Sequence, residues 1–246
     1  MKFGAIIIGD EILSGKRQDK HMATAIETLA TRGLELAWCQ YLGDDPGLIT
    51  ETLRRTFAAG DVVFSFGGIG ATPDDHTRQC AAAALNLGLR IHPDAEREIR
   101  GRFGADTTPQ RLAMGEFPQG AVVIPNPVNR IPGFSLREHH FVPGFPQMAW
   151  PMVEWVLDAK YRDLFNRDRW TEKSILVFEA GESQLIPAMK EVEAGFRGIK
   201  VFSLPSMGQD GSRIHVELGV RGAPQEVEPA MDKLCRLVRD AGFPYK

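Results

Sequence analysis

The chain has 246 residues, of which 43% are hydrophobic and 25% are charged, and this composition excludes disordered and fibrous proteins. Its 29 basic and 32 acidic residues give a formal net charge of −3, which favours binding neither to nucleic acid nor to an anionic membrane. No apolar stretch approaches the roughly 20 residues that span a bilayer, and the N-terminus does not resemble a signal peptide, so we expect a cytoplasmic protein. The three widely separated cysteines predict neither a disulfide framework nor a metal site.

Strand and helix patterns alternate along the first third of the chain. The predicted strands cover residues 2–9, 34–42 and 61–66, and the predicted helices cover residues 19–32, 46–59 and 74–87. Because the strands are nearly unbroken apolar runs, they predict a parallel sheet that is covered by helices on both faces. Ligands of such sheets bind beyond the carboxyl ends of the strands.

The rest of the chain predicts one long loop and a second, smaller domain. Residues 101–132 are irregular and rich in proline, which indicates an ordered, functional loop before a last helix at residues 147–157. Residues 158–169 form a charged linker, so the predicted domains are residues 1–165 and 170–246. In the second domain, strands at 173–179, 199–204 and 212–220 and helices at 182–195 and 224–241 predict a β-α-β-β-α order.

The densest group of candidate site residues lies at residues 67–77 (GGIGATPDDHT), between a predicted strand and a predicted helix. Glycines let backbone N–H groups approach an anion, and a helix N-terminus attracts one, so this loop is a candidate phosphate site. Its spacing matches neither a P-loop nor a dinucleotide fingerprint. A purely structural alternative is that Thr72 caps the helix, Pro73 is its first residue and Asp75 completes a capping box.

Carboxylates close to the glycines favour a metal site at the same place. Asp74 and Asp75 would repel a phosphate unless a cation lay between them, and Mg²⁺ commonly binds one or two carboxylates together with phosphate oxygens. Further acids follow the first two predicted strands, at residues 10–11 and 44–45, although Asp45 also fits a helix cap. Acids from successive strand ends are therefore expected to meet at one edge of the sheet.

Three other features are either ambiguous or weak evidence for a functional site. His76 is compatible with a base that faces a ligand and with a surface residue, and residues 19–21 are equally compatible with a solvated turn. Residues 208–211 (GQDG) match the GxxG of RNA-binding KH domains, but they carry an acid and lie between predicted strands, so RNA binding is not expected. The chain contains no HExxH, no GxSxG and no Cys/His spacing that would fix zinc.

Three motifs in this order resemble a known family: IGDEILSG at residues 8–15, GGIGATPDDHT at 67–77 and PGFPQM at 143–148. They are similar to the MoaB/Mog-like molybdopterin-binding domain, and most of all to its CinA (competence/damage-inducible) branch. The resemblance covers about residues 1–160, and residues 171–241 resemble the small KH-like domain that follows in CinA proteins. No part of the chain resembles the C-terminal amidohydrolase domain of full-length CinA, so deamidation of nicotinamide mononucleotide is not expected.

The resemblance implies a three-layer α/β/α fold with a mostly parallel sheet, a small C-terminal α+β KH-like domain and a homo-oligomer. It implies that a pterin, such as molybdopterin, or a nucleotide is bound through phosphate groups. In the CinA branch it implies a pyrophosphatase for ADP-ribose-like substrates that depends on Mg²⁺ or another divalent cation. By position, the implied ligand contacts are Gly67, Gly68, Gly70, Thr72, Asn126 and Gly144, the catalytic acids are Glu11, Asp44 and Asp75, and the metal ligands are Glu11, Asp74 and Asp75.

Two loops depart from the CinA pattern. Residues 126–133 read NPVNRIPG where NxxGTAPG is usual, and residues 20–21 read KH where TN is common. Both loops are expected to reach the ligand, so the departures imply either a different substrate or a loss of catalysis. Arg130 is a candidate phosphate contact, because its planar guanidinium can pair with two oxygens, or else an arginine of a surface loop.

The sequence therefore predicts a Mg²⁺-dependent hydrolase of a nucleoside diphosphate-linked compound such as ADP-ribose. In this hypothesis the carboxylates hold the metal and orient water, while the loop amides stabilise charge on the phosphate oxygens. The alternative is a non-catalytic protein that binds molybdopterin or a nucleotide.

Overall fold

The computed structural model describes residues 1–166, 170–208 and 213–246. The chain divides into two compact units, Met1–Phe165 and Asn166–Lys246. Most of the GQDG motif at residues 208–211, and part of the predicted linker at 158–169, lie outside the described residues. Among the helices that the structure describes, none has the length and apolar character needed to cross a membrane.

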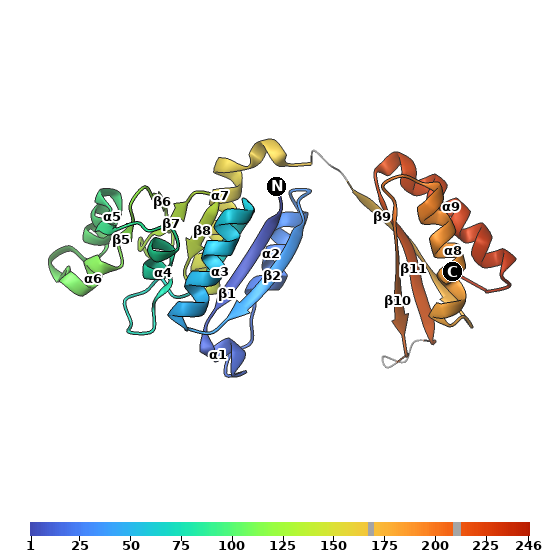
Figure 1. The fold of residues 1–246 in the computed structure, drawn as a ribbon, viewed down its shortest axis with the longest axis horizontal. Coiled ribbons are helices and arrows are strands. Elements are labelled where there is room, and N and C mark those ends of the chain that lie inside the picture. The colour runs from blue at the N-terminus through green and yellow to red at the C-terminus, as the bar shows by residue number, and fades with distance from the viewer. Residues whose placement is uncertain (167–169, 209–212) are drawn as a thin grey trace. The chain divides into compact units, whose positions relative to one another are not determined.

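A six-stranded sheet forms the centre of the first unit, in the order β2-β1-β3-β8-β7-β6 (Figure 1). Strands β2, β1, β3 and β8 run parallel, and β7 is antiparallel to both of its neighbours. Every residue of β1 and β3 is buried, which explains their unbroken apolar sequences. The strands are β1 (Phe3–Ile8), β2 (Leu36–Leu42), β3 (Val62–Phe66), β6 (Val122–Ile124), β7 (Gly133–Leu136) and β8 (His139–Val142).

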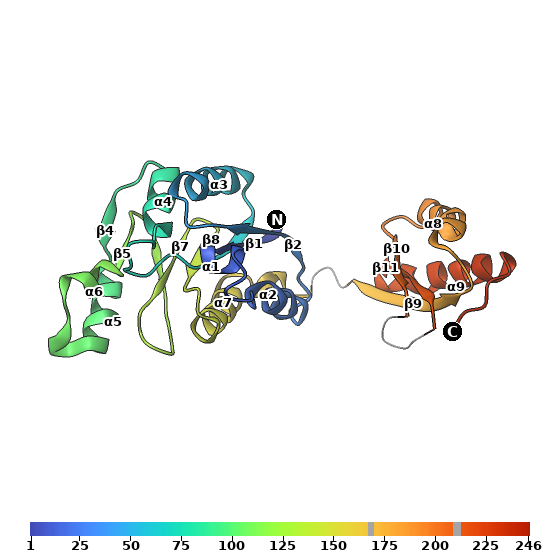
Figure 2. The same cartoon turned by 90° about the horizontal axis from the view of Figure 1, so that it is seen from below.

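Helices cover both faces of this sheet, as Figure 2 shows. On one face, α3 (Pro46–Ala59) and α4 (Thr77–Ala84) bury side chains such as Leu53 and Ala81. On the other face, α2 (His21–Ala30) and α7 (Pro146–Lys160) bury side chains such as Leu29 and Val153. The predicted three-layer α/β fold is confirmed.

The segment between α4 and β6 is more regular than the sequence predicted. It holds α5 (Pro93–Phe103), a 3₁₀ turn (Gly104–Asp106), α6 (Pro109–Ala113) and a two-stranded sheet of β4 (Leu89–Ile91) and β5 (Glu116–Pro118). The prediction of an irregular stretch at residues 101–132 was therefore only partly right. The 3₁₀ turn, α6, β4 and β5 have only three to five residues, too few to show a hydrophobic period. The eleven-residue α5 was also not predicted, because it is mostly charged and buries only Ala95 and Ile99.

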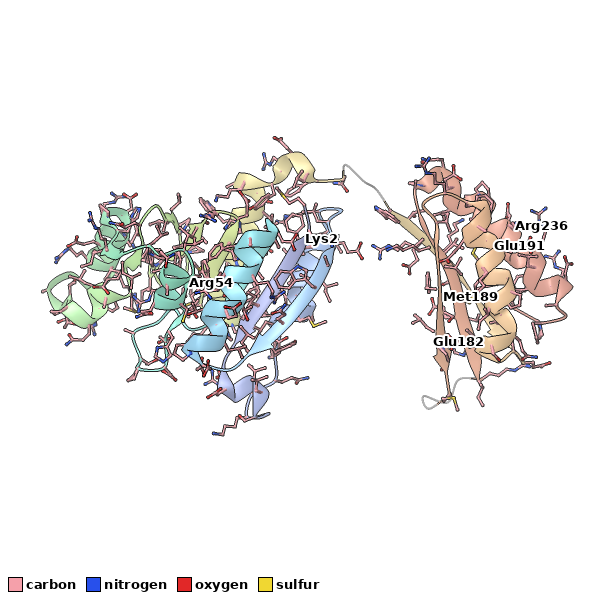
Figure 3. All side chains as sticks on the ribbon, viewed as in Figure 1. Lys2, Arg54, Glu182, Met189, Glu191 and Arg236 are labelled. Carbon is pink, nitrogen blue, oxygen red and sulfur yellow. The ribbon has the colours of Figure 1, made fainter. Side chains whose placement is uncertain are left out.

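The second unit has the predicted β-α-β-β-α order. Its elements are β9 (Thr171–Phe178), α8 (Glu182–Gly195), β10 (Lys200–Ser206), β11 (His215–Gly222) and α9 (Pro224–Asp240). The strands form an antiparallel sheet in the order β10-β11-β9, and both helices pack on one of its faces (Figure 1). Glu191 of α8, labelled in Figure 3, pairs with Lys233 of α9 at 3.0 Å. The unit thus has its own core.

The outer strand β2 is held in place by the indole of Trp38. A Cβ atom at Gly4 of β1 would lie 2.2 Å from the Trp38 ring, so the ring covers the bare backbone of its neighbour strand. Its Nε1 donates a hydrogen bond to Asp61 at 3.0 Å. The absence of a side chain at Gly4 is therefore a packing requirement.

A buried polar chain lies at the start of β8, at the edge of the sheet opposite the glycine loop. The Tyr161 hydroxyl donates to Glu138, so the Nε2 of His140 donates to Tyr161 at 2.7 Å and its Nδ1 accepts from Ser135 at 2.8 Å. Burial, followed by the charges of neighbouring basic residues, holds the pKa of His140 well below its ordinary value. His140 is therefore neutral in the folded protein.

His139 is buried beside it in the same state. Its Nε2 donates to the Thr56 hydroxyl at 2.8 Å, because that hydroxyl donates to the carbonyl of Leu53, and its ring packs on Phe57 at 4.0 Å. Burial lowers the pKa of His139 to about 3. Both imidazoles thus gain protons only when the unit unfolds.

We expect the stability of the first unit to fall as the pH decreases below about 6.5, the ordinary pKa of histidine. Between that value and the depressed pKa of the folded state, the unfolded chain binds more protons, so each histidine contributes a slope of about 1.4 kcal/mol per pH unit. When urea unfolding is measured from pH 7 to pH 5, the free energy of unfolding of the His139→Phe variant should depend less steeply on pH than that of the parent, by the contribution of one histidine. An unchanged slope in this variant would contradict the assignment of a neutral His139.

Candidate functional site

The loops that follow β1, β3 and β8 meet at one edge of the sheet and surround two cavities. One cavity of about 370 Å³ is lined by residues 68–72, by Asp75 and by apolar side chains that include Met114, Ile131 and Met148. The other, of about 360 Å³, is lined by residues 11–12, 17–21 and 144–147. Both cavities include Gly144 and Phe145, so they adjoin across the loop after β8. This is the edge at which parallel sheets bind ligands.

The first turn of α4 fixes the conformation of the glycine loop. The Thr77 hydroxyl donates to the carbonyl of Gly67 at 3.1 Å, and the Thr77 amide donates to that of Gly68 at 3.0 Å. The guanidinium of Arg78 donates to the carbonyl of Gly70. Three of the loop's carbonyls therefore point toward α4.

The amides of the same peptide groups point the other way. In a trans peptide the N–H lies opposite the C=O, so the amides of Gly68, Ile69 and Ala71 are directed away from α4. Within the described residues, no hydrogen-bond acceptor is found for the amides of residues 68–71. These residues line the larger cavity, and a row of unpaired amides is a binding site for an anion.

The glycines are needed because other parts of the chain occupy the space of a side chain. A Cβ atom at Gly68 would lie 2.2 Å from the Thr77 hydroxyl, and one at Gly70 would lie 2.4 Å from a carboxylate oxygen of Asp75. Gly67 and Gly68 also have φ angles of +102° and +68°, which other residues rarely adopt. Close packing within the loop, rather than approach of a ligand, thus accounts for these glycines.

Residues 72–75 form a separate turn before α4 begins at Thr77. The amide and hydroxyl of Thr72 donate to the carboxylate of Asp75, the amide at 2.8 Å, and the amide of Asp75 donates to the Thr72 carbonyl at 3.0 Å. The helix expected at 74–87 is present but shorter, at Thr77–Ala84, and the alternative in which Pro73 is its first residue is wrong. Asp75 satisfies a backbone amide as in a capping box, but no helix follows directly. Its carboxylate holds the loop in shape.

Four carboxylates gather at the ends of β1, β2 and β3. The amide of Asp10 donates to Asp44 at 2.9 Å, and the amide of Asp44 donates to Asp10 at 3.2 Å, so each loop holds the other. Partial burial, and then the negative charges of Asp10, Glu11 and Asp74, raise the pKa of Asp44. The sequence prediction that acids from successive strand ends would lie near one another agrees with this arrangement.

Among the described residues, these acids do not by themselves form a cluster of metal ligands. In residues 1–166, 170–208 and 213–246, no three His, Cys, Asp or Glu side chains converge closely enough to hold a metal ion. Mg²⁺, however, commonly uses one or two carboxylates and completes its shell with waters and phosphate oxygens. The mutual repulsion at Asp44 is the property that a divalent cation would relieve.

The structure adds His21 to the residues that the motifs singled out as site contacts. Its Nε2 donates to the carbonyl of Gly144 at 3.1 Å, and its ring stacks on Phe66 at 4.4 Å. Burial lowers its pKa, and its Nδ1 has no partner among the described residues. His21 therefore contacts the backbone segment that the two cavities share. The sequence left residues 19–21 open between a solvated turn and a loop that reaches the ligand.

Asn126 and Arg130 lie away from the glycine loop. The side chain of Asn126 accepts from the amide of Val128 at 3.0 Å and donates to the carbonyl of Ile131 at 2.9 Å, so it holds its own loop together. Arg130 pairs with Glu98 of α5 at 3.0 Å. Neither lines the larger cavity, whereas Gly68, Gly70, Thr72 and Gly144 do.

Comparison with known proteins agrees with this geometry. Residues 4–162 match the family described as "Probable molybdopterin binding domain". The chain belongs to this family. Its relatives place it in the CinA branch of the MoaB/Mog-like proteins, as the motifs predicted.

Two relatives and one solved structure illustrate this placement. A protein of Thermoplasma acidophilum is 31% identical over 83% of this chain and 81% of its own length. A CinA-like protein of Anaeromyxobacter is 30% identical over 87% of this chain, which spans 57% of that protein. The crystal structure of the protein CinA, of unknown function, from Thermoplasma acidophilum superposes with a TM-score of 0.59 at 29% identity, over 65% of this chain and 98% of that one.

Replacing Gly68 by alanine should destabilise the first unit more than the same change at Gly15. Both residues have φ near +70°, but a Cβ at Gly15 meets nothing within 4 Å, whereas one at Gly68 meets Thr77. Backbone strain alone costs about 1–2 kcal/mol, and displacement of Thr77 should add about 1–3 kcal/mol at Gly68 only. Urea unfolding of both variants measures the difference, and equal losses would show that Thr77 gives way freely.

Replacing Asp44 by asparagine should stabilise the protein when no divalent cation is present. Asparagine still accepts the hydrogen bond from Asp10, but it removes a charge that three acids repel. The melting temperature should rise by about 2–4 °C for each kcal/mol gained in a unit of this size. The control is Asp45→Asn, because Asp45 caps α3 through the amide of Leu48 and asparagine caps equally well. A lower melting temperature for Asp44→Asn alone would refute the repulsion.

Proposed function

We propose that the first unit hydrolyses a diphosphate-linked nucleotide compound, of which ADP-ribose is a representative, with Mg²⁺ or another divalent cation. One observation carries the proposal: residues 68–71, whose amides have no acceptor among the described residues, line a cavity at the same sheet edge as Asp44, a partly buried carboxylate near three other acids. The amides supply an anion site and the acids supply a cation site. A phosphate group with a divalent cation satisfies both.

The two adjoining cavities offer room for the two halves of such a compound. The larger has apolar walls at Met114, Ile131 and Met148, which suit a planar ring, beside the amides that suit a phosphate. The smaller is lined by Arg17 and Lys20, for which the described residues provide no ion-pair partner. We propose that one phosphate lies against the loop amides and that the remainder of the substrate extends past Gly144.

Hydrolysis requires a water molecule, a proton acceptor and stabilisation of the leaving phosphate. Water forms a new O–P bond at one phosphorus, the bridging P–O bond breaks, and ADP-ribose would yield AMP and ribose 5-phosphate. A divalent cation, when bound, would offset the negative charge on the phosphate oxygens. Asp44 would accept the proton of the water, since burial, the main cause of its raised pKa, persists when a cation is bound and only one of its oxygens is hydrogen-bonded by a backbone amide.

The other acids take separate roles in this proposal. Glu11 and Asp74 would hold the cation, because both are close enough to Asp44 for their charges to act on it. Asp75 would act on the loop amides rather than on the cation, since its carboxylate is already bound by Thr72. The loop amides would bind the phosphate.

A non-catalytic binder of molybdopterin or a nucleotide is the second candidate. It is favoured by the lining of the larger cavity, where Asp75 is the one acid and its carboxylate is engaged by the loop. Such a protein would bind its ligand tightly and release it unchanged.

The proposal predicts turnover of diphosphate-linked compounds. ADP-ribose, flavin adenine dinucleotide and related compounds would be incubated with Mg²⁺, Mn²⁺ or Co²⁺ and the products identified by mass spectrometry. Asp44→Asn should lower kcat by at least roughly 100-fold, the usual contribution of a general base. Asp94→Asn is the matched control, because Asp94 is an exposed acid on α5 that pairs with Arg97.

The two candidates give different outcomes in this experiment. Cleavage at the diphosphate by the parent and by Asp94→Asn, but not by Asp44→Asn, supports the hydrolase. Absence of cleavage with every cation, together with tight calorimetric binding of a pterin or nucleotide, replaces the hydrolase with the binding protein. Equal turnover by Asp44→Asn would leave a hydrolase in which Asp44 is not the base.

A further inference from the structure

Arg78 is a buried arginine that lies directly behind the glycine loop. It is the second residue of α4, and only 3% of its surface is exposed. One guanidinium nitrogen donates to the carbonyl of Gly70 and the other to the carbonyl of Ala113. The side chain therefore ties the loop to the end of α6.

The charge of Arg78 is not neutralised by an ion pair. Among the residues that the structure describes, no carboxylate lies within salt-bridge distance of Arg78, and its Nε has no hydrogen-bond partner. Burial acts to lower its pKa, while the more distant charges of Asp75 and Glu116 act to raise it. A guanidinium does not lose its proton in a protein, so a positive charge remains in the interior.

Arg78 contacts the backbone of two segments that contribute to the lining of the larger cavity. Arg78 donates to the carbonyl of Gly70, and the amide of the same peptide group, that of Ala71, points to the other side. The second carbonyl it binds precedes Met114, which lines the cavity. The charge thus stands behind the unpaired amides, where its field adds to theirs, and few solvent molecules are present to screen it.

We propose that Arg78 is a positioning residue of the anion site: it fixes the direction of the loop amides and places behind them a positive charge that is neutralised only when an anionic group is bound. This inference rests on the proposed binding of phosphate at the loop. It assigns the strength and charge selectivity of that binding to a residue that does not line the cavity. The charge of Arg78 therefore increases the affinity more for a ligand group that carries more negative charge.

The test compares Arg78→Met, Arg78→Lys and the parent protein in calorimetric binding of inorganic phosphate and pyrophosphate, at low and at physiological ionic strength. Arg78→Met should weaken binding of both anions by about 10-fold or more, lose more for pyrophosphate than for phosphate, and reduce the dependence on salt. Arg78→Lys keeps the charge but cannot join two carbonyls, so it should bind more weakly than the parent with an unchanged dependence on salt.

A matched control separates these effects from a general change in charge. Arg54, labelled in Figure 3, is an exposed arginine of α3 that pairs with Glu51, and Arg54→Met should bind both anions like the parent. Added guanidinium, compared with equal sodium chloride, should restore binding to Arg78→Met, because the ion replaces the missing head group. A purely structural role for Arg78 predicts equal losses for the two anions and an unchanged salt dependence.

The outcomes distinguish this inference from the proposed function. If the parent binds phosphate or pyrophosphate and Arg78→Met binds both as tightly, the role of Arg78 is refuted and the anion site stands. If the parent binds neither anion, with or without Mg²⁺, both the anion site and this inference fall. If Arg78→Met does not fold, Arg78→Gln, which keeps a hydrogen-bond donor but carries no charge, replaces it: parental affinity, or a loss that is equal for the two anions and leaves the salt dependence unchanged, overturns the inference.

Discussion

Two residues at the start of α4 determine how the loop after β3 presents its backbone. Thr77 and Arg78 donate to the carbonyls of Gly67, Gly68 and Gly70, which turns the amides of the same peptide groups away from α4, in a loop that lines the larger cavity. A flexible glycine-rich loop would have to order its amides each time an anion bound, at a cost in conformational entropy. Here that ordering is already made by the helix, so the loop is organised before any ligand arrives.

The acids at the same edge of the sheet, by contrast, are arranged in a way that destabilises the folded protein. Asp44 lies half-buried between loops, and this burial, with the charges of three other carboxylates as a smaller cause, raises its pKa. No cation-bearing side chain closes a salt bridge with Asp44 or Asp10 in the part of the chain that the structure describes. This arrangement lowers the stability of the folded protein. Destabilising arrangements of this kind are common at binding and catalytic sites.

Most of the first unit could be predicted from its sequence because its elements are long and strongly patterned. The predicted helix at 46–59 matches α3, and the apolar runs match β1 and β3. The start of α4 was mistaken because residues 72–75 carry the sequence of a helix cap while forming a turn of their own. Local sequence preferences identify the hydrogen bonds of a cap, but not whether a helix follows.

Only the part of the candidate site that consists of sequence motifs could be predicted. Glycines and acids at strand ends are visible in a sequence, since topology alone brings strand ends together. The burial of Arg78 and the stacking of His21 on Phe66 depend on contacts between distant segments, and no pattern in the sequence encodes them. In the same way, the sequence left Arg130 open between a phosphate contact and an arginine of a surface loop, and its ion pair with Glu98 of α5 could not be read from the sequence.

The packing of Trp38 on Gly4 has a consequence for the outer edge of the sheet. Trp38 is the largest residue of β2, and it pairs with Gly4, the one residue of β1 that has no side chain. If β2 slid by one residue, the indole would strike Phe3 or Ala5, and its bond to Asp61 would be lost. The indole therefore favours the observed register of the edge strand β2 over registers shifted by one residue.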